Sequence, residues 1–554
     1  MSSLKKSEIN LEKEFSEISQ KYKILNLIGE GSYGIVVKAI NKKTNKTCAI
    51  KKLKNIISDS INSKRLLREI NIFRQLSEYP NKYIIQLYDI IIPNEKLVNS
   101  IYLIMEYCDL NLFQLIHSNF KFNYEIIKKI TTDILKGLLY IFKRGIIHRD
   151  MKPDNILIKI ENNSFTAKLC DFSLSRDLTL DFSTEDLLNY FFTEYEYKNM
   201  QFTEEGININ ELREGIENEN LNEEMRIYIN KKLDELSEKL FNDKNRKIPI
   251  TNFIIDSLYL DFISNENKFN CKNYYDLYKI YKEQDKKFKN PLTPKIITRF
   301  YRPPEILLLE KIYTYSIDIW GLGCIIGEML LKKLGFIQPL IPGDSSFFIS
   351  PNEIEGNINL SDNDQLTLIL QLFGGINNND LNFISDDYKK QFTFHINESI
   401  KNKKDKIIYI EVFNKLDDKY KDLIWVMKNM LKFNPCDRIK PASALRYLHK
   451  NLDINLKIEY PIIYNKWERI DFDENDLKKA FIEEMNEWNI SKMEFSLNNF
   501  GIKDFDNSNN VKIGNCNLFN NNLNFSNNNN KGSFNVFNEC DKENYNNKVK
   551  GIFD

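Results

Sequence analysis

The segment GIIHRDMKPDNILI places three polar side chains of complementary chemistry in one short stretch: Asp150, Lys152 and Asn155. A carboxylate at Asp150 can orient a hydroxyl group and accept its proton. Lys152 can neutralise charge on a phosphoryl group in transit, and the amide oxygen of Asn155 can ligate a magnesium ion. These residue types at this spacing indicate transfer of a phosphoryl group to a hydroxyl. His148, in the same string, is expected to have a structural role.

A glycine-rich segment, IGEGSYGIVVKA, lies between two strand-like runs and contains Gly29, Gly31 and Gly34. Without side chains there, backbone N–H groups can approach triphosphate oxygens closely. On its own the segment would equally fit a glycine hairpin in any sheet protein. The string CAIKK follows at the spacing of a paired strand, so Lys51 can project toward the same phosphates. Glu69, on the next helical stretch, can hold Lys51 by an ion pair.

The string AKLCDFSLSR supplies a further acidic residue, Asp171. Divalent cations that bridge phosphates favour carboxylate oxygens, so Asp171 is the candidate for a second magnesium ligand beside Asn155. A full set of residues for phosphate ligation and proton transfer is therefore expected between Gly29 and Asp171.

The charge balance and the cysteines restrict the classes of function. Lys plus Arg and Asp plus Glu both number 78 in 554 residues, so the formal net charge is zero and no basic field favours a nucleic acid or an anionic membrane. The start, MSSLKKSEINLEKEF, has no apolar stretch, and no later run reaches the length of a membrane span. The eight cysteines lack the spacing of metal ligands. We expect a soluble intracellular protein in the cytoplasm, with the nucleus left open.

The elements that must position these side chains form two groups. Up to Cys108, the short runs YKILNLI, GIVVKAI, CAIKKL and SIYLIMEY, with the helical stretch LLREINIFRQL, predict a small sheet with one helix. From Leu110 to Asp453 most periodic segments are helical. The pattern predicts an α+β fold of two lobes, one small and β-rich, the other large and helical. The expected boundaries are 1–21 for an extension, 22–107 for the smaller lobe, 108–458 for the larger lobe, 459–497 for a C-terminal extension with a helix, and 498–554 for an Asn-rich tail.

A long stretch, 177–296, fits neither lobe and is predicted to be an insert. It contains a helix candidate, NEEMRIYINKKLDELSEKL, with apolar residues at helical spacing. After Asn498 the biased sequence NLFNNNLNFSNNNN has no period that could bury a core, so the tail is predicted to be disordered.

In order and type, these motifs resemble the eukaryotic protein kinases over Tyr22 to Asp453. The resemblance implies ATP and Mg²⁺ as cofactors and protein hydroxyls as acceptors. It also implies that Met105 is the gatekeeper and that the backbones of Glu106 and Cys108 pair with adenine. The residues expected to bind ATP are Ile28, Gly29, Glu30, Gly31, Ser32, Tyr33, Gly34, Val36, Ala49, Lys51, Met105, Glu106, Cys108 and Leu157.

The sequence departs from the family pattern at Ser173, where family members usually have Gly. Because Gly has the greater backbone freedom, we expect Ser173 to narrow the conformations of this segment without touching a ligand atom. Glu305, at the end of Pro-Pro-Glu, stands where the family has Ala-Pro-Glu. The resemblance implies that Glu305 pairs with Arg438 inside the larger lobe.

The strings IITRFYRPPEILL and YTYSIDIWGLGCIIGEML look like the group that contains cyclin-dependent and mitogen-activated protein kinases. In that group the residue matching Arg302 shapes a pocket that accepts proline. Proline-directed phosphorylation of Ser or Thr is therefore implied.

Three features favour the mitogen-activated branch. The first is the triplet Thr193-Glu194-Tyr195, similar to the branch's dual phosphorylation site. The second is a set of arginines able to form a cationic pocket for a phosphothreonine: Arg65, Arg68 and Arg149. The third is FDENDLKKAFIEEMNEW, similar to the extension that packs back onto the smaller lobe in this branch, although an ordinary capped helix would also fit.

Alternatives remain at two points. Thr293 stands at the spacing from Thr298 at which both branches place their activating threonine, so it rivals Thr193. For the whole chain, an active mitogen-activated-type enzyme with an upstream activating kinase is favoured. A cyclin-dependent type, activated by a partner through the Glu69 helix, and a pseudokinase scaffold are the other hypotheses. The intact Lys51 and Asp150 argue against the scaffold.

Overall fold

The computed structural model describes most of the two expected lobes and one C-terminal helix. The described residues are 10–31, 34–54, 56–57, 60–161, 164–177, 297–310, 315–346, 348–349, 363–384, 386–402, 409–450, 463, 467 and 472–497. Several predictions lie outside them: the phosphorylation sites Thr193, Tyr195 and Thr293, the glycine-segment residues Ser32 and Tyr33, nearly all of the insert, and the tail.

The smaller lobe is built on an antiparallel five-stranded sheet with the order β1-β2-β3-β5-β4. Its strands are β1 (Tyr22–Gly31), β2 (Gly34–Asn41), β3 (Thr47–Lys54), β4 (Leu87–Ile91) and β5 (Ser100–Glu106). Along β2, buried and partly exposed residues alternate, as expected when one face of a strand packs on a core. Helix α2 (Ser60–Glu78) follows β3. The sequence runs predicted β1, β2, β3, β5 and α2, but not the short edge strand β4.

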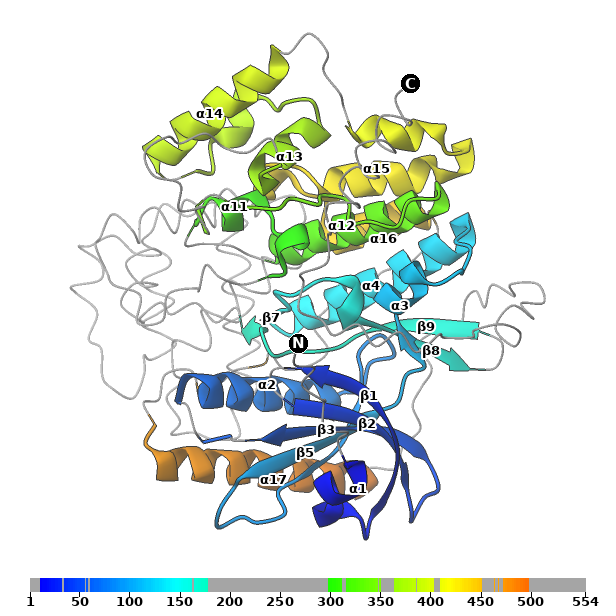
Figure 1. Ribbon diagram of the computed structural model, residues 1–554, viewed down its shortest axis with the longest axis vertical. Helices are drawn as coiled ribbons and strands as arrows, with labels where there is room; N and C mark the ends of the chain where they lie inside the picture. The colour runs from blue at the N-terminus through cyan, green and yellow to red at the C-terminus, as the bar shows by residue number, and fades with distance from the viewer. Residues whose placement is uncertain are drawn as a thin grey trace, which may run out of the picture.

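The N-terminal segment packs on this sheet in two short turns, α1 (Leu11–Glu14) and η1 (Ser16–Ile18). Phe15 and Ile18 are buried and share a core cluster with Tyr102 of β5. Glu14 forms ion pairs with Lys52 and Lys54 of β3. Part of the predicted N-terminal extension therefore belongs to the folded lobe and covers one side of its sheet (Figure 1).

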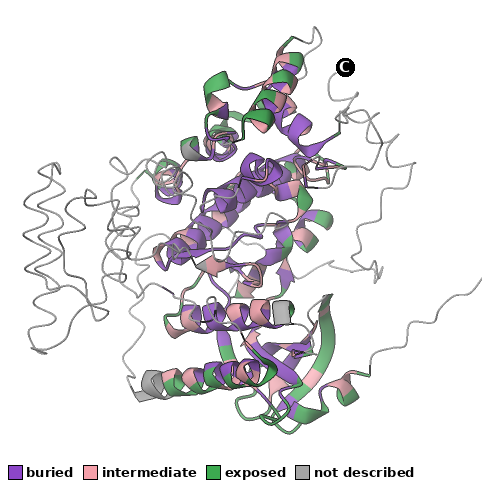
Figure 2. Ribbon diagram, turned by 90° about the vertical axis from the view of Figure 1, so that its left-hand side faces the viewer, coloured by how far each residue is buried: buried purple, intermediate pink, exposed green. Residues whose placement is uncertain are grey.

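The larger lobe is helical, and α12 (Ser316–Lys333) runs through its core. Every residue of α12 from Ser316 to Leu331 is buried, which is the pattern of a helix enclosed on all sides (Figure 2). The other described helices are α3 (Leu112–His117), α4 (Tyr124–Lys143), α11 (Pro304–Leu307), α13 (Gln365–Leu372), α14 (Asp387–Lys401), α15 (Lys421–Met430) and α16 (Pro441–Leu448). A side chain at Gly321 would meet Met151 at 2.6 Å, so this glycine lets α12 approach the loop that carries Asp150.

Short strands and 3-10 turns flank the loops that contain the predicted site residues. One small sheet joins β6 (Leu110–Asn111), β8 (Ile156–Glu161) and β9 (Ser164–Leu169), and another joins β7 (Ile146–Ile147) to β10 (Arg176–Asp177). The predicted chemistry-bearing segments lie at the ends of these strands. The 3-10 turns near them are η2 (Pro153–Asn155) and η3 (Arg299–Tyr301), and η4 (Asn378–Leu381), η5 (Tyr409–Lys415), η6 (Asp418–Tyr420) and η7 (Pro435–Asp437) lie farther along the larger lobe.

The C-terminal helix α17 (Glu474–Leu497) returns to the smaller lobe and lies beside α2 (Figure 1). Its buried residues recur at helical spacing: Leu477, Ala480, Phe481, Glu484, Met485 and Trp488. The expectation that the C-terminal extension packs onto the smaller lobe is therefore confirmed for this helix. Within the described part of the chain, no helix combines the length and the apolar character needed to cross a membrane.

Candidate active site

One face of the smaller sheet gathers the residues expected to contact a nucleotide. In the β2–β3 register Val36 lies opposite Lys51, and in the β3–β5 register Ala49 lies opposite Met105. Directly paired residues of antiparallel strands share a face, and so do residues two apart on one strand. Val36, Ala49, Lys51 and Met105 therefore share one face, while Lys52 projects from the other face toward Glu14.

Lys51 is held by a carboxylate from α2. Its Nζ lies 2.5 Å from Oε1 of Glu69, whose side chain is buried, while the Lys51 side chain is partly buried. Burial by itself lowers the pKa of Lys51, but the charges of Glu69 and Asp171 raise it above its usual value. The lysine is therefore a fixed positive charge between two carboxylates, and the sequence predicted its ion pair with Glu69.

The catalytic loop brings Asp150, Lys152 and Asn155 into mutual contact. Lys152 Nζ lies 2.7 Å from Asp150 Oδ2. Asn155 Nδ2 donates to the same oxygen and to the Asp150 carbonyl, at 2.9 Å each. The loop therefore fixes the Asp150 carboxylate from two sides.

Thr298, from the far side of the insert, joins this group. Its hydroxyl accepts a hydrogen bond from Lys152 Nζ at 3.2 Å and donates to Asp150 Oδ1 at 3.3 Å. The sequence predicted no role for Thr298 beyond its spacing from Thr293. Its position at the start of TRFYRPPE, a string that resembles the family, could have marked Thr298 as a candidate. The spacing in the sequence does not show that Thr298 reaches Asp150.

A buried carboxylate on α12 anchors the catalytic loop. Asp318 accepts hydrogen bonds from the backbone amides of His148 and Arg149, at 2.7 and 2.8 Å. Arg149 has a φ of 66°, a left-handed conformation that a non-glycine residue adopts only at a cost. Burial raises the pKa of Asp318 to about 6. The string SIDIW indicated only a family resemblance and did not predict this role of Asp318.

His148 behaves as the structural residue that the sequence predicted. It is fully buried, and its Nε2 lies 2.9 Å from the carbonyl oxygen of Cys170. The contact ties the catalytic loop to the segment before Asp171, which itself has a φ of 63°. The candidate base and the candidate metal ligand are therefore connected through His148 and Cys170.

Ser173 contacts a candidate ligand residue, so the expectation that it would touch no ligand atom is wrong. Its amide donates to Asp171 Oδ1 at 3.3 Å, and its side chain also hydrogen-bonds to Asp171. Burial alone would raise the pKa of Asp171, but Lys51 and these hydrogen bonds hold it below its usual value. A hydroxyl can reach back to a carboxylate two residues earlier, as short polar side chains often do in turns.

The residues present fit a magnesium–nucleotide complex. Both hydrogens of the Asn155 amide nitrogen are directed to Asp150, which leaves the Asn155 oxygen as the atom able to ligate a cation. Asp171 is held as a carboxylate by its lowered pKa. One amide oxygen and one carboxylate suit Mg²⁺ that keeps water and phosphate oxygens as its other ligands.

The glycine segment is only partly described, and its last glycine also has a packing role. A Cβ on Gly34 would lie 1.9 Å from the carbonyl oxygen of Lys52 on β3. Gly34 is therefore required where β2 and β3 approach each other, whatever the segment binds. Gly29, Glu30 and Gly31 pair with β2, and Ile28 beside them is exposed.

Glu106, in the segment expected to bind adenine, forms ion pairs with two lysines of the larger lobe. Oε1 of Glu106 lies 2.6 Å from Lys159 Nζ of β8. Oε2 lies 3.0 Å from Lys168 Nζ of β9, an ion pair without a hydrogen bond. Leu157 lies opposite Lys168 in the β8–β9 register, so the hairpin that pairs with Glu106 also carries this expected nucleotide contact. Burial raises the pKa of Cys108 to about 12, so its thiol is neutral.

The predicted pocket arginines are placed on two elements. Arg65 and Arg68 are partly buried on α2, whereas Arg149 is buried in the catalytic loop. Arg149 Nε donates to the carbonyl of Leu174 at 2.5 Å. A shared phosphate pocket stays a prediction.

The segment that follows the insert, residues 297–305, is anchored in the larger lobe. Arg302 donates to the carbonyl of Ile297 at 3.0 Å and to the hydroxyl of Ser346 at 3.3 Å. Glu305 and Arg438 form a buried two-pronged ion pair at 2.6 and 2.7 Å, as the sequence predicted. The backbone on both sides of Arg302 is therefore fixed.

The sequence of the chain matches a family model and resembles several known proteins. The family model described as "Protein kinase domain" matches residues 22–199 and 276–449. Mitogen-activated protein kinase 6 of Arabidopsis thaliana is 26% identical over 476 residues, which cover 85% of this chain and 82% of that protein. Mitogen-activated protein kinase 1 of Oryza sativa subsp. japonica is 27% identical over 436 residues, covering 78% and 73%. Mitogen-activated protein kinase 13 of Arabidopsis thaliana is 25% identical over 468 residues, covering 84% and 90%.

Proposed function

The chain belongs to the protein kinase family, and from this premise we propose that it is a mitogen-activated-type kinase that phosphorylates Ser or Thr followed by Pro. The observation that carries the phosphotransfer is the connected set Lys51, Glu69, Asp150, Asn155 and Asp171. The branch is supported by the relatives, which are named mitogen-activated protein kinases, and by α17 on the smaller lobe.

The site residues divide the work by charge. Asp150, fixed by Asn155 and Lys152, orients the acceptor hydroxyl and takes its proton. Lys152 neutralises charge on the phosphoryl group, and Lys51 holds the nucleotide phosphates. Asn155 and Asp171 would hold Mg²⁺, which would supply positive charge to offset that of the nucleotide phosphates.

The preference for proline is proposed for the segment around Arg302. The hydrogen bonds to Ile297 and Ser346 direct the Arg302 guanidinium into the protein. Because these bonds hold the Arg302 side chain in place, we expect it to shape a pocket for the proline of the substrate. We do not expect it to bind the substrate by charge.

Regulation by an upstream kinase is proposed through Thr193 and Tyr195, with Thr293 as the rival site. The family match is interrupted between residues 199 and 276, so the triplet lies in the first matched stretch and Thr293 in the second. Both threonines therefore fall in sequence that aligns with the family, and Thr193 is favoured by its triplet. An intracellular location, in the cytoplasm with or without the nucleus, is part of this proposal and rests on composition alone.

The test is transfer of labelled phosphate from Mg-ATP to a peptide with Ser-Pro or Thr-Pro, with a Ser-Ala peptide as the matched control. The protein is first treated with an upstream kinase or purified in phosphorylated form. Asp150→Asn is expected to abolish transfer, and the Ser-Ala peptide to be a poor acceptor. No transfer by any phosphorylated preparation would refute the proposal, and equal use of both peptides would refute the proline preference.

The phosphorylation sites are tested with the same assay. Thr193→Ala combined with Tyr195→Phe is expected to remove activation, while Thr293→Ala leaves it. If Thr293→Ala removes activation and the triplet substitutions do not, the site assignment is reversed and the catalytic proposal stands.

A further inference from the structure

The N-terminal segment, residues 10–18, lies outside the part of the chain that matches the protein kinase family. The family match begins at residue 22. The structure nevertheless places two large apolar side chains of this segment, Phe15 and Ile18, in a buried cluster with the sheet of the smaller lobe. The contacts of the segment are therefore additions to the matched domain.

The N-terminal segment covers the face of the sheet opposite to the nucleotide side. Successive residues of a strand point to opposite faces, so Lys51 and Lys52 of β3 project to opposite sides. The ring of Phe15 is fully buried, and its centre lies 5.9 Å from that of Tyr102 on β5. The cluster around Phe15 includes the strand residues that alternate with the nucleotide-facing ones: Ile35, Val37, Ala39, Cys48, Ile50, Tyr102 and Ile104. A second small core therefore lies behind the strand that carries Lys51.

Lys52 is the polar centre of this contact. Its Nζ lies 2.8 Å from Oε1 of Glu14 and donates to the Glu14 carbonyl oxygen at 2.7 Å. The same ammonium group lies 5.2 Å from the centre of the Tyr102 ring and 5.9 Å from that of Phe15. A buried ammonium group is costly unless it is paired, so these contacts define the position of Lys52 narrowly.

Further contacts join the N-terminal segment to two strands. Glu14 also pairs with Lys54 Nζ at 2.7 Å, two residues farther along β3 on the same face. Glu17 accepts hydrogen bonds on β5 from Ser100 Oγ at 3.0 Å and from Tyr102 Oη at 2.5 Å. Burial raises the pKa of Glu14, but its two lysine partners hold it below its usual value, so the carboxylate is ionised at neutral pH.

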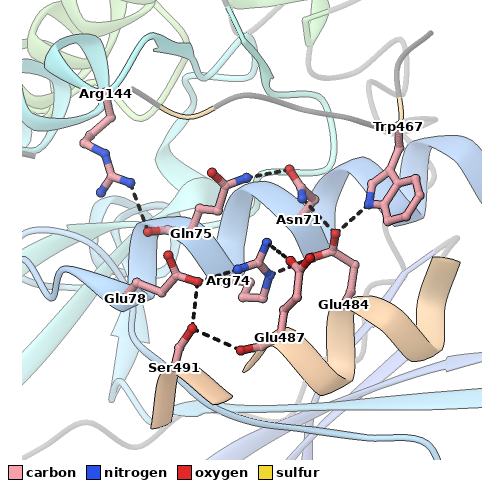
Figure 3. A network of polar contacts seen from close by, with 9 residues as sticks. All are labelled: Asn71, Arg74, Gln75, Glu78, Arg144, Trp467, Glu484, Glu487 and Ser491. Atoms are coloured by element: carbon pink, nitrogen blue, oxygen red, sulfur yellow. Dashed lines mark hydrogen bonds and ion pairs between the residues drawn. The ribbon is translucent and has the colours of Figure 1, made fainter. Parts of the chain in front are cut away.

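Both elements that carry the Lys51–Glu69 ion pair are supported by segments outside the matched residues 22–199 and 276–449. Glu69 belongs to α2, which packs on α17, where Glu484 accepts a hydrogen bond from Asn71 at 2.8 Å (Figure 3). Strand β3 has the N-terminal segment in the corresponding role. Because adjacent residues of a strand move together, a shift of β3 that displaced Lys51 would also break the contacts of Lys52.

We propose that the N-terminal segment positions Lys51 for the nucleotide phosphates, with Glu14 and Lys52 as the positioning residues. The inference rests on the proposed function, in which Lys51 holds those phosphates. The contacts of Lys52 behind the sheet limit the movement of β3, and Lys51 is its neighbour on the same strand. Loss of these contacts would let the strand shift, so ATP would bind more weakly while the binding of the protein substrate is unchanged.

The test is the dissociation constant of Mg-ATP, measured by isothermal titration calorimetry on the full-length protein with Glu14→Gln. Glutamine has nearly the shape of glutamate, so the change removes the charge that meets Lys52 and keeps the backbone carbonyl. We expect Kd to rise by about threefold, with an unchanged KM for the Ser-Pro peptide. In the Lys51→Met background, where the phosphates have lost their lysine, the same change should alter Kd by less than about 1.5-fold.

A purely structural role would give a different result. If Glu14→Gln changes Kd by the same factor with and without Lys51, or lowers only the unfolding temperature, the inference is overturned.

The matched control is Lys42→Ala. Lys42 is exposed after the end of β2 and donates to the Ser19 carbonyl oxygen at 2.8 Å, whereas Lys52 lies opposite the start of β2. The control should leave Kd unchanged. A rise equal to that of Glu14→Gln would overturn the assignment of Glu14 and Lys52 as positioning residues.

A second variant addresses the same contact from the strand. Lys52→Met removes the ammonium group and keeps most of the apolar stem beside Phe15 and Tyr102. Combined with Glu14→Gln, it should raise Kd no further than the larger of the two single changes, because both remove one contact. Additive effects would overturn the inference. Loss of transfer in Asp150→Asn, measured in parallel, reports on the proposed function, whereas the binding of Mg-ATP reports on the N-terminal segment independently of transfer.

Discussion

The catalytic loop and the Glu69 helix contribute to the same site, but they are anchored in different ways. The loop is fixed inside the larger lobe, where Asp318 of the buried helix α12 accepts from its backbone at 2.7 and 2.8 Å. Helix α2 is fixed by α17, whose contact residue Glu484 lies 413 residues from Asn71 along the chain. The catalytic loop is therefore anchored in the core of the larger lobe. Helix α2 is instead packed against α17, a helix near the C-terminal end of the described chain.

The difference predicts where control can act. Displacement of the loop would require rearrangement of α12, the most enclosed helix that the structure describes. Displacement of α2 would break its contacts with α17 and with the sheet of the smaller lobe. Changes in the loop should therefore abolish turnover, and changes around α2 should adjust it.

The largest effect is expected for Asp318→Ala. The substitution leaves the amides of His148 and Arg149 without their acceptor and removes support for the left-handed backbone at Arg149. Misplacement of Asp150 by about 1 Å should lower kcat by about 100-fold. Steady-state kinetics measures this, with circular dichroism to establish that the variant is folded. A folded variant with kcat within threefold of the parent would show that the loop does not need α12.

A smaller effect is expected for Thr298→Ala, which removes the hydroxyl between Lys152 and Asp150. A hydrogen bond to a charged group contributes roughly 1.5–3 kcal/mol, so kcat should fall by about tenfold or more. Thr298→Ser keeps the hydroxyl and is the matched control, which should retain most of the activity. Equal losses in both variants would assign the effect to packing of the methyl group.

A few-fold effect is expected for Ser173→Gly, which restores the residue usual in the family. The change removes the hydroxyl that bonds to Asp171 and helps to keep its pKa low. The Mg²⁺ concentration for half-maximal activity should rise by about two- to fivefold, because the carboxylate is less firmly oriented. Titration with Mg²⁺ at fixed ATP measures it. An unchanged Mg²⁺ requirement would mean that the amide of Ser173 is sufficient.

No effect on turnover at pH 7 is expected for Glu328→Gln, which instead changes stability. Burial on α12 raises the pKa of Glu328 from its usual 4.5 to about 8, and Tyr301 donates to it at 2.8 Å. The folded state therefore keeps a proton that the unfolded state releases between these values, so stability falls as pH rises through this window. The loss should be on the order of a few kcal/mol by pH 9.

Denaturant unfolding at pH 6 and pH 9 tests this prediction. The parent protein should lose more stability between the two pH values than Glu328→Gln, whose side chain cannot ionise. An equal loss of stability in the parent and in Glu328→Gln would show that Glu328 is already ionised in the folded state. The result separates the stability of the larger lobe from the chemistry of the loop that it supports.

The residues of the site could be predicted where function requires a particular side chain at a particular spacing. Asp150, Lys152 and Asn155 stand in one loop, and Lys51 projects from a strand beside the glycine segment, so local sequence was sufficient to group them. Strand β4 was missed because it is a short edge strand within a longer apolar stretch. The contact of Ser173 with Asp171 was missed because backbone freedom was considered and the reach of the hydroxyl was not.

The supporting residues could not be predicted in the same way. Asp318, Thr298 and Glu484 are common polar residues, and nothing in their local sequence distinguishes a buried anchor from a solvated side chain. Their roles come from proximity across 170, 148 and 413 residues, respectively, measured to His148, Asp150 and Asn71.

The sequence alone determined the chemistry of this protein, because proton transfer and phosphate ligation need specific functional groups and those groups lie close together along the chain. Only the tertiary structure decided what holds them: α12 beneath the catalytic loop and α17 against α2. The physical reason is that a buried charge must find its partners wherever the packed chain brings them, and packing joins residues that are remote in sequence.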